Sequence, residues 1–473
     1  MAGSFLAYEE PSIVLILILI SFFFFLSLAE WLSSIVVRAG IIGPIIVGII
    51  YGMPLADILF DIWQETFLAI GYIGLILIIF EGGLTSRMDL LKQNFFLSML
   101  AATTGVLFPI GLSYLLLYLG FGYGAVETFI IGAALSTTSL GTTFAVIGGA
   151  SKDIDLSQTR VGTVLVSAAV IDDVSGLVMS SVIHDLGSIS DGASVNLGWL
   201  IGRPILASFL MAALTPLICK YVLAPLFRRY VEHHFARFDH LSNVVLMVLV
   251  LCAFISIAAY AGTGVLFGAF LAGSLLTYLL SKHPEGPFVV YSREHGEQND
   301  DKSPTFVHRF EKYFSDVQKY LMEPLFFASI GFAIPFVDLW TGSAIWHGGF
   351  WIPLWDLLTK PKTDALKPSL SQTIPSAGLL GFAMVARGEI GLLIVEIGYN
   401  STPYVSDAGF YTAVWAILLN TIIGPMVVGL LIKFRGRAIG DGHWGIQSPE
   451  GSEKNRRPQS NPQDQRLEEG QSG

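Results

Sequence analysis

Hydrophobic residues along this 473-residue chain gather in long runs that short polar segments separate. Many runs approach the roughly 20 residues that a helix needs to cross a bilayer. The period is helical, and nothing suggests the alternating segments of a membrane β-barrel. The pattern predicts an all-α polytopic membrane protein of about 12 spans, at residues 11–37, 40–53, 66–84, 95–119, 125–148, 159–184, 197–226, 241–260, 263–281, 317–341, 373–398 and 406–432.

Two polar stretches fall outside these runs. Residues 282–316 are charged and predict a cytosolic loop. The chain from about Gly440 is rich in Gly, Ser, Pro, Gln and charge, a composition typical of disorder. We therefore expect a transmembrane domain at 1–434 and a disordered cytosolic tail at 435–473.

The distribution of lysine and arginine predicts the orientation, because cytoplasmic segments carry an excess of both. With the N-terminus outside and the spans alternating, all but two of the 27 basic residues fall in inside segments or beside them. The two exceptions, Arg203 and Arg387, lie within spans. The C-terminus is then cytosolic.

This topology has one defect between residues 341 and 373. The span 317–341 should end outside, yet Lys360, Lys362 and Lys367 should lie inside. The stretch SAIWHGGFWIPLWDLL between them, residues 343–358, is too short to cross a bilayer as a helix. We therefore expect that one core helix is missing from this chain.

Composition supports a membrane location and narrows the function. The chain is 53% hydrophobic and 14% charged, whereas soluble domains are about a quarter charged. The net charge of −10 is spread over loops and tail, so it indicates no nucleic-acid partner. No GxxxxGK[ST] run supports ATP-driven transport, and no cofactor is expected.

The stretch SAAVIDDVSGLVMSS places two adjacent carboxylates, Asp172 and Asp173, at the middle of a span. A charge at the bilayer centre costs roughly 2.5–3.5 kcal/mol, so the pair indicates function more than a buried carboxylate satisfied by its neighbours. Burial and a second carboxylate both favour protonation. Such a group holds a proton or a cation in turn, which is the minimal machinery for exchanging them.

Two further segments interrupt their spans. ALSTTSLGTTFAVIGG is rich in hydroxyls, which can bind helix carbonyls or mark a broken helix. In FAMVARGEIGLLIVEIG, Arg387 and Glu389 flank Gly388, as an internal ion pair or as charge compensating the aspartates. Interrupted segments in both halves are typical of inverted repeats. The hydroxyls expected to line the first break are those of Ser136, Thr137, Thr138 and Ser139.

With AAVIDDVSGLV, the stretches GIIGPIIVGIIYG, EPLFFASIGFAI and MVARGEIGLLI resemble signatures of the monovalent cation:proton antiporters of the sodium/hydrogen exchanger superfamily, over about 11–434. The resemblance implies an inverted-repeat fold with two crossed discontinuous helices. It also implies a homodimer, with a rigid dimerisation part and a moving core. The expected membrane is the plasma membrane or a vacuolar or endosomal membrane.

By the same resemblance, Asp173 binds Na⁺, K⁺ or Li⁺ transiently in exchange for protons. Asp172 pairs with a lysine that the family carries between the PLFFASIGF and ARGE segments. That lysine would fall in the missing crossing, so we expect a shortened form with impaired transport. Doubled aspartates further imply two protons per sodium ion and electrogenic exchange.

Other functional classes remain as alternatives. A cation channel or a non-transporting sensor could also use broken helices. An intramembrane aspartyl protease is disfavoured because its two aspartates must face each other from different helices. Asp172 and Asp173 are adjacent on one helix and point about 100° apart. No enzyme activity is therefore expected.

Overall fold

The computed structural model describes residues 10–36, 40–85, 95–138, 160–187, 197–231, 239–276, 306–342, 378–385 and 389–440. These residues are mostly helical and contain no strand. The α-helices are α1 (Ile13–Val36), α2 (Ile42–Tyr51), α3 (Asp61–Thr85), α5 (Phe95–Ser113), α6 (Ala125–Ser136), α8 (Arg160–Gly187), α9 (Leu197–Ile218), α10 (Ala224–Leu226), α12 (Asp239–Ala261), α13 (Val265–Leu276), α15 (Phe306–Phe310), α16 (Glu323–Ala333), α20 (Glu389–Ser401) and α21 (Asp407–Gly440).

Several helices continue through wider π-helical turns. These turns are Tyr114–Gly120 after α5, Cys219–Leu223 and Phe227–Val231 on either side of α10, and Glu311–Ser315 and Gln318–Met322 between α15 and α16. A short 3₁₀ turn spans Asp338–Trp340.

The described helices confirm the all-α prediction of a multi-pass membrane protein. Helices α2, α6, α13 and α20 are apolar but shorter. Six helices are long and apolar enough to cross a membrane, namely Ile13–Val36, Asp61–Thr85, Phe96–Gly120, Gly202–Leu226, Ser242–Ala261 and Asp407–Val428.

Two helix boundaries differ clearly from their predictions. The sequence predicts a span that ends at residue 432 and a disordered tail from 435, but α21 continues to Gly440, so the tail prediction is wrong for residues 435–440. The second difference lies between residues 306 and 341. The helical segment expected at 317–341 begins at Phe306, within the predicted loop, and ends at Ala333. Phe306 and Phe310 are buried, and the Phe310 ring lies 5.7 Å from that of Phe80, so packing extends the helix. Pro335 ends it, because a proline disfavours helical geometry at the preceding residue, here the extended Ile334.

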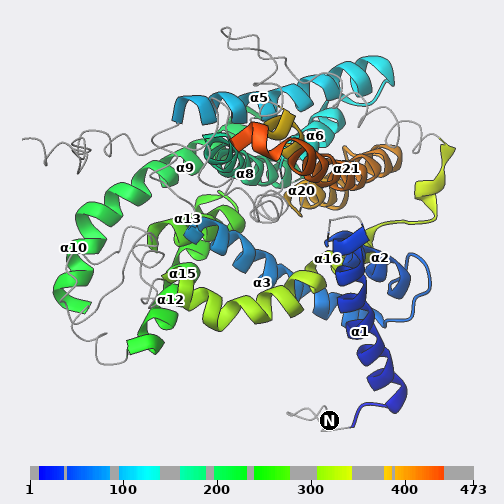
Figure 1. Cartoon of the computed structure of the whole chain (residues 1–473), viewed down its shortest axis with the longest axis horizontal. Coiled ribbons are helices and arrows are strands. Elements are labelled where there is room, and N and C mark those ends of the chain that lie inside the picture. Colours follow the sequence, from blue (N-terminus) through cyan, green and yellow to red (C-terminus); the bar gives the residue numbers. More distant parts are fainter. Residues whose placement is uncertain are drawn as a thin grey trace, which may run out of the picture.

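The helices form two groups (Figure 1). One contains α1, α2, α3, α12, α13, α15 and α16, and we call it the scaffold group. The other contains α5, α6, α8, α20 and α21, and we call it the core group. Helix α9 packs on both α8 and α13 and so contacts each group.

Glycines let the scaffold helices approach closely. A Cβ at Gly48 of α2 would meet the carbonyl of Ala328, and one at Gly331 would meet the carbonyl of Ile45. Gly83 and Gly273 make the same reciprocal contact between α3 and α13. Small residues at helix crossings are typical of packing in membranes, where van der Waals contact replaces the hydrophobic driving force.

The predicted missing crossing falls in 343–377, outside the described residues, but the segments on either side are placed. Before the gap, the Leu339 carbonyl accepts a hydrogen bond of 2.9 Å from Trp415 Nε1, in the first half of α21. After it, a Cβ at Gly378 would lie 3.7 Å from Leu431, near the other end of α21. About 24 Å of helix separates Trp415 from Leu431. The described chain therefore contacts α21 near one end before the gap and near the other end after it.

Candidate functional site

Helix α8 carries the two aspartates near its middle. Asp172 is 0% exposed and Asp173 is 3% exposed. Burying even one ionised carboxylate is costly unless hydrogen bonds or a cation compensate it. The two side chains leave α8 about 100° apart, so they meet different surroundings.

The first predicted interruption lies beside this pair. Helix α6 ends at Ser136, and Thr137 is extended with φ −71° and ψ 133°. The hydroxyl of Ser136 donates to the Ala133 carbonyl at 2.7 Å, and that of Thr137 donates to the Ala134 carbonyl at 3.1 Å. These bonds satisfy carbonyls that the end of a helix leaves without amide partners. The helix expected over 125–148 thus stops at its first hydroxyl cluster.

The end of α6 is joined directly to the acidic pair. The backbone N–H of Thr138 donates a hydrogen bond of 2.6 Å to Asp172 Oδ2. A backbone donor at this length holds a carboxylate oxygen firmly and fixes its direction. The broken helix therefore orients Asp172.

The second predicted interruption reaches the same place. A short helix at 378–383 gives way to a turn at Met384 and Val385, and α20 starts at Glu389. Gly391 of α20 packs against the end of α6, where a Cβ would lie 2.8 Å from the Ala134 carbonyl and 3.1 Å from Thr137 Oγ1. The expected break in 373–398 is therefore present in the described residues and abuts the first.

A glycine on α8 makes room for this convergence. Gly176 lies one turn beyond Asp172, and a Cβ there would collide with Thr137 Cγ2 and lie 3.1 Å from Ile390 Cγ2. The end of α6, the start of α20 and the middle of α8 thus pack tightly around the aspartates. The C-terminus of α6 carries partial negative charge and the N-terminus of α20 partial positive charge. Together with two carboxylates, they form an oxygen-rich, buried environment that suits a small cation.

Some predicted site residues cannot be placed. Ser139 and Arg387 lie outside the described residues. Glu389 is the first residue of α20, but its side chain is not described. The compensating role of Arg387 and Glu389 therefore stays a prediction. Among the hydroxyl residues that are described, Ser136, Thr137 and Thr138 are all buried at the break.

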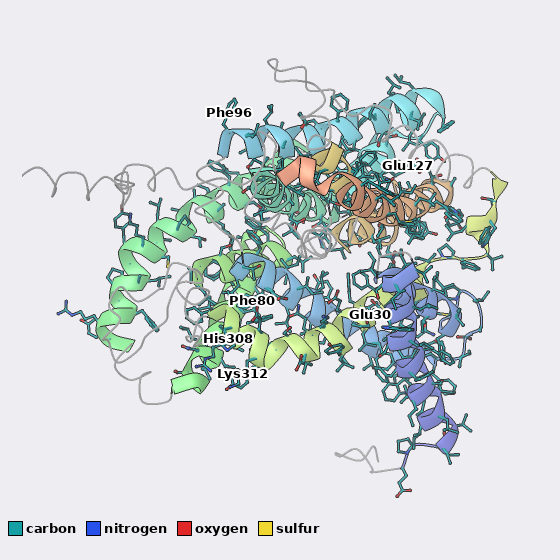
Figure 2. The ribbon with its side chains drawn as sticks, viewed as in Figure 1. Glu30, Phe80, Phe96, Glu127, His308 and Lys312 are labelled. Atoms are coloured by element: carbon teal, nitrogen blue, oxygen red, sulfur yellow. The ribbon has the colours of Figure 1, made fainter. Side chains whose placement is uncertain are left out.

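The structure also shows a buried carboxylate that the sequence analysis missed, Glu127 in the first turn of α6 (Figure 2). It is 6% exposed. Its Oε2 accepts the Gly124 N–H at 3.2 Å, and its Oε1 accepts the Ser406 N–H at 2.9 Å and the Ser406 hydroxyl. Glu127 thereby ties the start of α6 to that of α21. An acidic residue in a first helical turn, where the dipole favours it, was the available signal.

The fold and the site together define a multi-pass helical membrane transporter, in which two interrupted helices meet at a buried acidic pair. Residues 18–433 match the family described as sodium/hydrogen exchanger, transmembrane. The chain belongs to this family.

Known relatives are similar along most of their length. A Na⁺/H⁺ antiporter of Enterococcus hirae is 26% identical over 396 residues, which cover 83% of this chain and 91% of the relative. The Na⁺/H⁺-K⁺ antiporter GerN of Bacillus cereus is 25% identical over 422 residues, covering 87% and 95%.

A solved structure shares the fold. The sodium proton antiporter MjNhaP1 from Methanocaldococcus jannaschii, solved at pH 8, superposes with a TM-score of 0.53 and 18% sequence identity. The match covers 88% of this chain and 99% of that one.

Proposed function

We propose that this protein exchanges a monovalent cation for protons across a membrane by alternating access at Asp172 and Asp173. The observation that carries the proposal is the burial of both carboxylates where α6 ends and α20 begins. The printed functions of the relatives, Na⁺/H⁺ exchange in Enterococcus hirae and Na⁺/H⁺-K⁺ exchange for GerN, support Na⁺ as the first cation to test, with K⁺ and Li⁺ beside it.

In this proposal the two aspartates have different tasks. Asp172 is oriented by the Thr138 amide and shapes the site. Asp173 binds the cation and releases it when protonated, because one carboxylate cannot hold a proton and a metal ion well at once. Alternating access then follows from movement of the core group against the scaffold group, as one part of an inverted-repeat transporter rocks against the other.

The proposal is tested in proteoliposomes that carry a pH gradient. Adding Na⁺, K⁺ or Li⁺ should dissipate the gradient if the protein exchanges that cation for protons. A channel would carry cation current without a strict coupling to protons, and a sensor would carry neither. Cation flux that leaves the pH gradient intact would therefore favour the channel.

The orientation and assembly stay predictions. We expect the N-terminus outside, the C-terminus in the cytosol and a homodimer, in the plasma membrane or a vacuolar or endosomal membrane. Helix α1 fits a position at the periphery of the helix bundle, because many of its large apolar side chains are exposed, such as Leu17, Phe24 and Trp31. These side chains can face lipid or a second copy.

We expect exchange to be sensitive to membrane potential. Two protons moving against one Na⁺ carry one net charge, worth about 2.3 kcal/mol per 100 mV. The attainable Na⁺ ratio should therefore change about tenfold for each ~60 mV. Clamping the potential with valinomycin and K⁺ gradients measures this directly. An equilibrium Na⁺ gradient that ignores the clamp would show electroneutral exchange instead.

We also expect Lys362 to report the topology of the predicted gap. A single cysteine at this position should be labelled from the outside if a crossing is missing, and from the cytosolic side if the chain crosses before it. Leu339 before the gap and Gly378 after it contact opposite halves of α21. The predicted impairment is measured separately, and exchange at the rate of the Enterococcus hirae relative would contradict it.

A further inference from the structure

Asn420 of α21 is a buried polar residue that the proposed mechanism does not yet use. It is 1% exposed, and neither its Nδ2 nor its Oδ1 has a hydrogen-bond partner within the described parts of the chain. A buried carboxamide without partners costs free energy that folding must offset. The position of Asn420 relative to the acidic pair can show what compensates this cost.

The contacts between α20 and α21 place Asn420 along the membrane. The Tyr399 ring stacks on the Phe410 ring with centroids 4.3 Å apart, and the Tyr399 hydroxyl donates to Asp407 Oδ1 at 3.0 Å. The two helices follow each other through a short connection and run in opposite directions. Moving about 15 Å along each, from Tyr399 to Glu389 and from Phe410 to Asn420, reaches the same level. Asn420 therefore lies level with the start of α20.

The contacts between α6 and α21 lead to the same level. Glu127 touches Gly409 and binds Ser406, so the two helices start together. Asn420 follows Gly409 by about three helical turns. Its side chain therefore leaves α21 within about 20° of the direction of Gly409, which is toward α6. The same number of residues leads from Glu127 to Thr138, where α6 has just ended.

A third contact agrees with both alignments, that of α21 with α20 and that of α21 with α6. Together they require Gly391 of α20 to lie beside the last turn of α6. It does, because its nearest neighbours are the Ala134 carbonyl and Thr137 Oγ1. Toward the end of α20 and the start of α6, a Cβ at Gly398 would likewise collide with Ile130. Asn420 is therefore level with both helix ends and with Asp172, which the Thr138 amide binds.

The chemistry of a carboxamide suits this position. The end of α6 presents carbonyl acceptors and the start of α20 presents N–H donors. A carboxamide offers both a donor and an acceptor without adding charge. The buried Oγ1 of Thr138 likewise has no partner among the described residues. Both side chains can therefore accept or donate further hydrogen bonds at this level of the membrane.

We propose that Asn420 is a positioning residue of the cation site, whose carboxamide supports the two helix ends, directly or through a water, when a monovalent cation is bound. This inference rests on the proposed cation/proton exchange. It adds a neutral group on α21 to the acidic pair on α8. In this inference, cation binding engages the carboxamide.

The experiment replaces Asn420 with leucine in the full chain, Asn420→Leu, and measures thermal unfolding in detergent with choline chloride or with increasing NaCl. Without Na⁺, we expect a melting temperature equal to or above that of the wild type. The substitution replaces a buried amide that lacks partners with an apolar side chain, which removes a desolvation cost. The NaCl concentration for half-maximal stabilisation should rise about tenfold, the loss of roughly one hydrogen bond. In proteoliposomes the KM for Na⁺ should rise similarly, with a smaller change in maximal rate.

Asn243→Leu is the matched control. Asn243 in α12 is 3% exposed, and its Oδ1 also lacks a partner among the described residues, but it belongs to the scaffold group. Its replacement should leave the Na⁺ dependence unchanged. Asn420→Ser, which is smaller and keeps a hydroxyl, should retain more of the Na⁺ response than Asn420→Leu and serves if leucine prevents folding.

Two results would overturn the inference alone. One is a wild-type Na⁺ dependence in both Asn420 variants. The other is a lower melting temperature of Asn420→Leu without Na⁺, which would give the amide a structural hydrogen bond. A wild-type protein that neither exchanges cations nor is stabilised by Na⁺, K⁺ or Li⁺ would instead overturn the proposed function, and this inference with it.

Discussion

Asp173→Asn is expected to reduce cation-dependent proton exchange to the background of empty liposomes. Asparagine keeps the size of the side chain, so the packing around α8 should survive. It removes the only property that lets the position alternate between proton and cation, which is its ionisable carboxyl group. The measurement is the dissipation of a pH gradient on addition of Na⁺, K⁺ or Li⁺.

Asp172→Asn is the internal comparison for this experiment. It can keep one acceptor oxygen for the Thr138 amide, so we expect a milder loss of rate and an altered ratio of charge to cation. Normal exchange by Asp173→Asn would show that the assignment of the binding carboxylate is wrong. If Asp172→Asn alone abolished exchange, the two roles would be reversed.

Gly176→Val is expected to slow exchange by about 100-fold, although it changes no polar group of the site. Any Cβ at this position collides with Thr137 Cγ2 and crowds Ile390. The broken end of α6 and the start of α20 must then move away from α8. A displacement of about 1 Å at a reacting site is enough for a loss of this size. The Na⁺ concentration needed for thermal stabilisation should rise as well.

Gly111→Val is the matched control, because it makes the same substitution within the core group. Among the described residues, no atom outside its own stretch of α5 lies within 4 Å of a Cβ at Gly111. This variant should therefore fold and exchange as the wild type does. Equal rates for Gly176→Val and the wild type would mean that α8 does not pack on the two helix ends during transport.

Asp172 and Asp173 could be recognised from the sequence because a doubled charge in an apolar run is costly and rare. The interruptions after Ser136 and at Met384 and Val385 could be anticipated for a related reason, since hydroxyls, glycine and charges nearby in the sequence compete with helical hydrogen bonds. The partners of these residues could not be anticipated. The bond from the Thr138 N–H to Asp172 joins residues 34 positions apart in the chain, which no local pattern pairs.

Glu127 and Asn420 show where single-sequence reasoning fails. Each is one polar residue in an apolar helix, a pattern that a helix end or a lipid interface explains equally well. Only the approach of α21 to α6 gives Glu127 its bonds to Ser406, and only the combined registers of α6, α20 and α21 bring Asn420 level with the breaks. The helix beginning at Phe306 was misjudged similarly, because its burial depends on Phe80.

The sequence by itself determined that this is an all-α membrane protein, that its spans include two interrupted ones, and that an acidic pair lies within a span. Those properties follow from local composition, because each charge or free backbone group in lipid carries its own free-energy cost, whatever its distant neighbours are. Tertiary structure decided which helix ends meet the acidic pair, which carboxylate the backbone orients, and which glycine lets the helices approach. Those properties depend on contacts between distant segments, whose close packing no local pattern encodes.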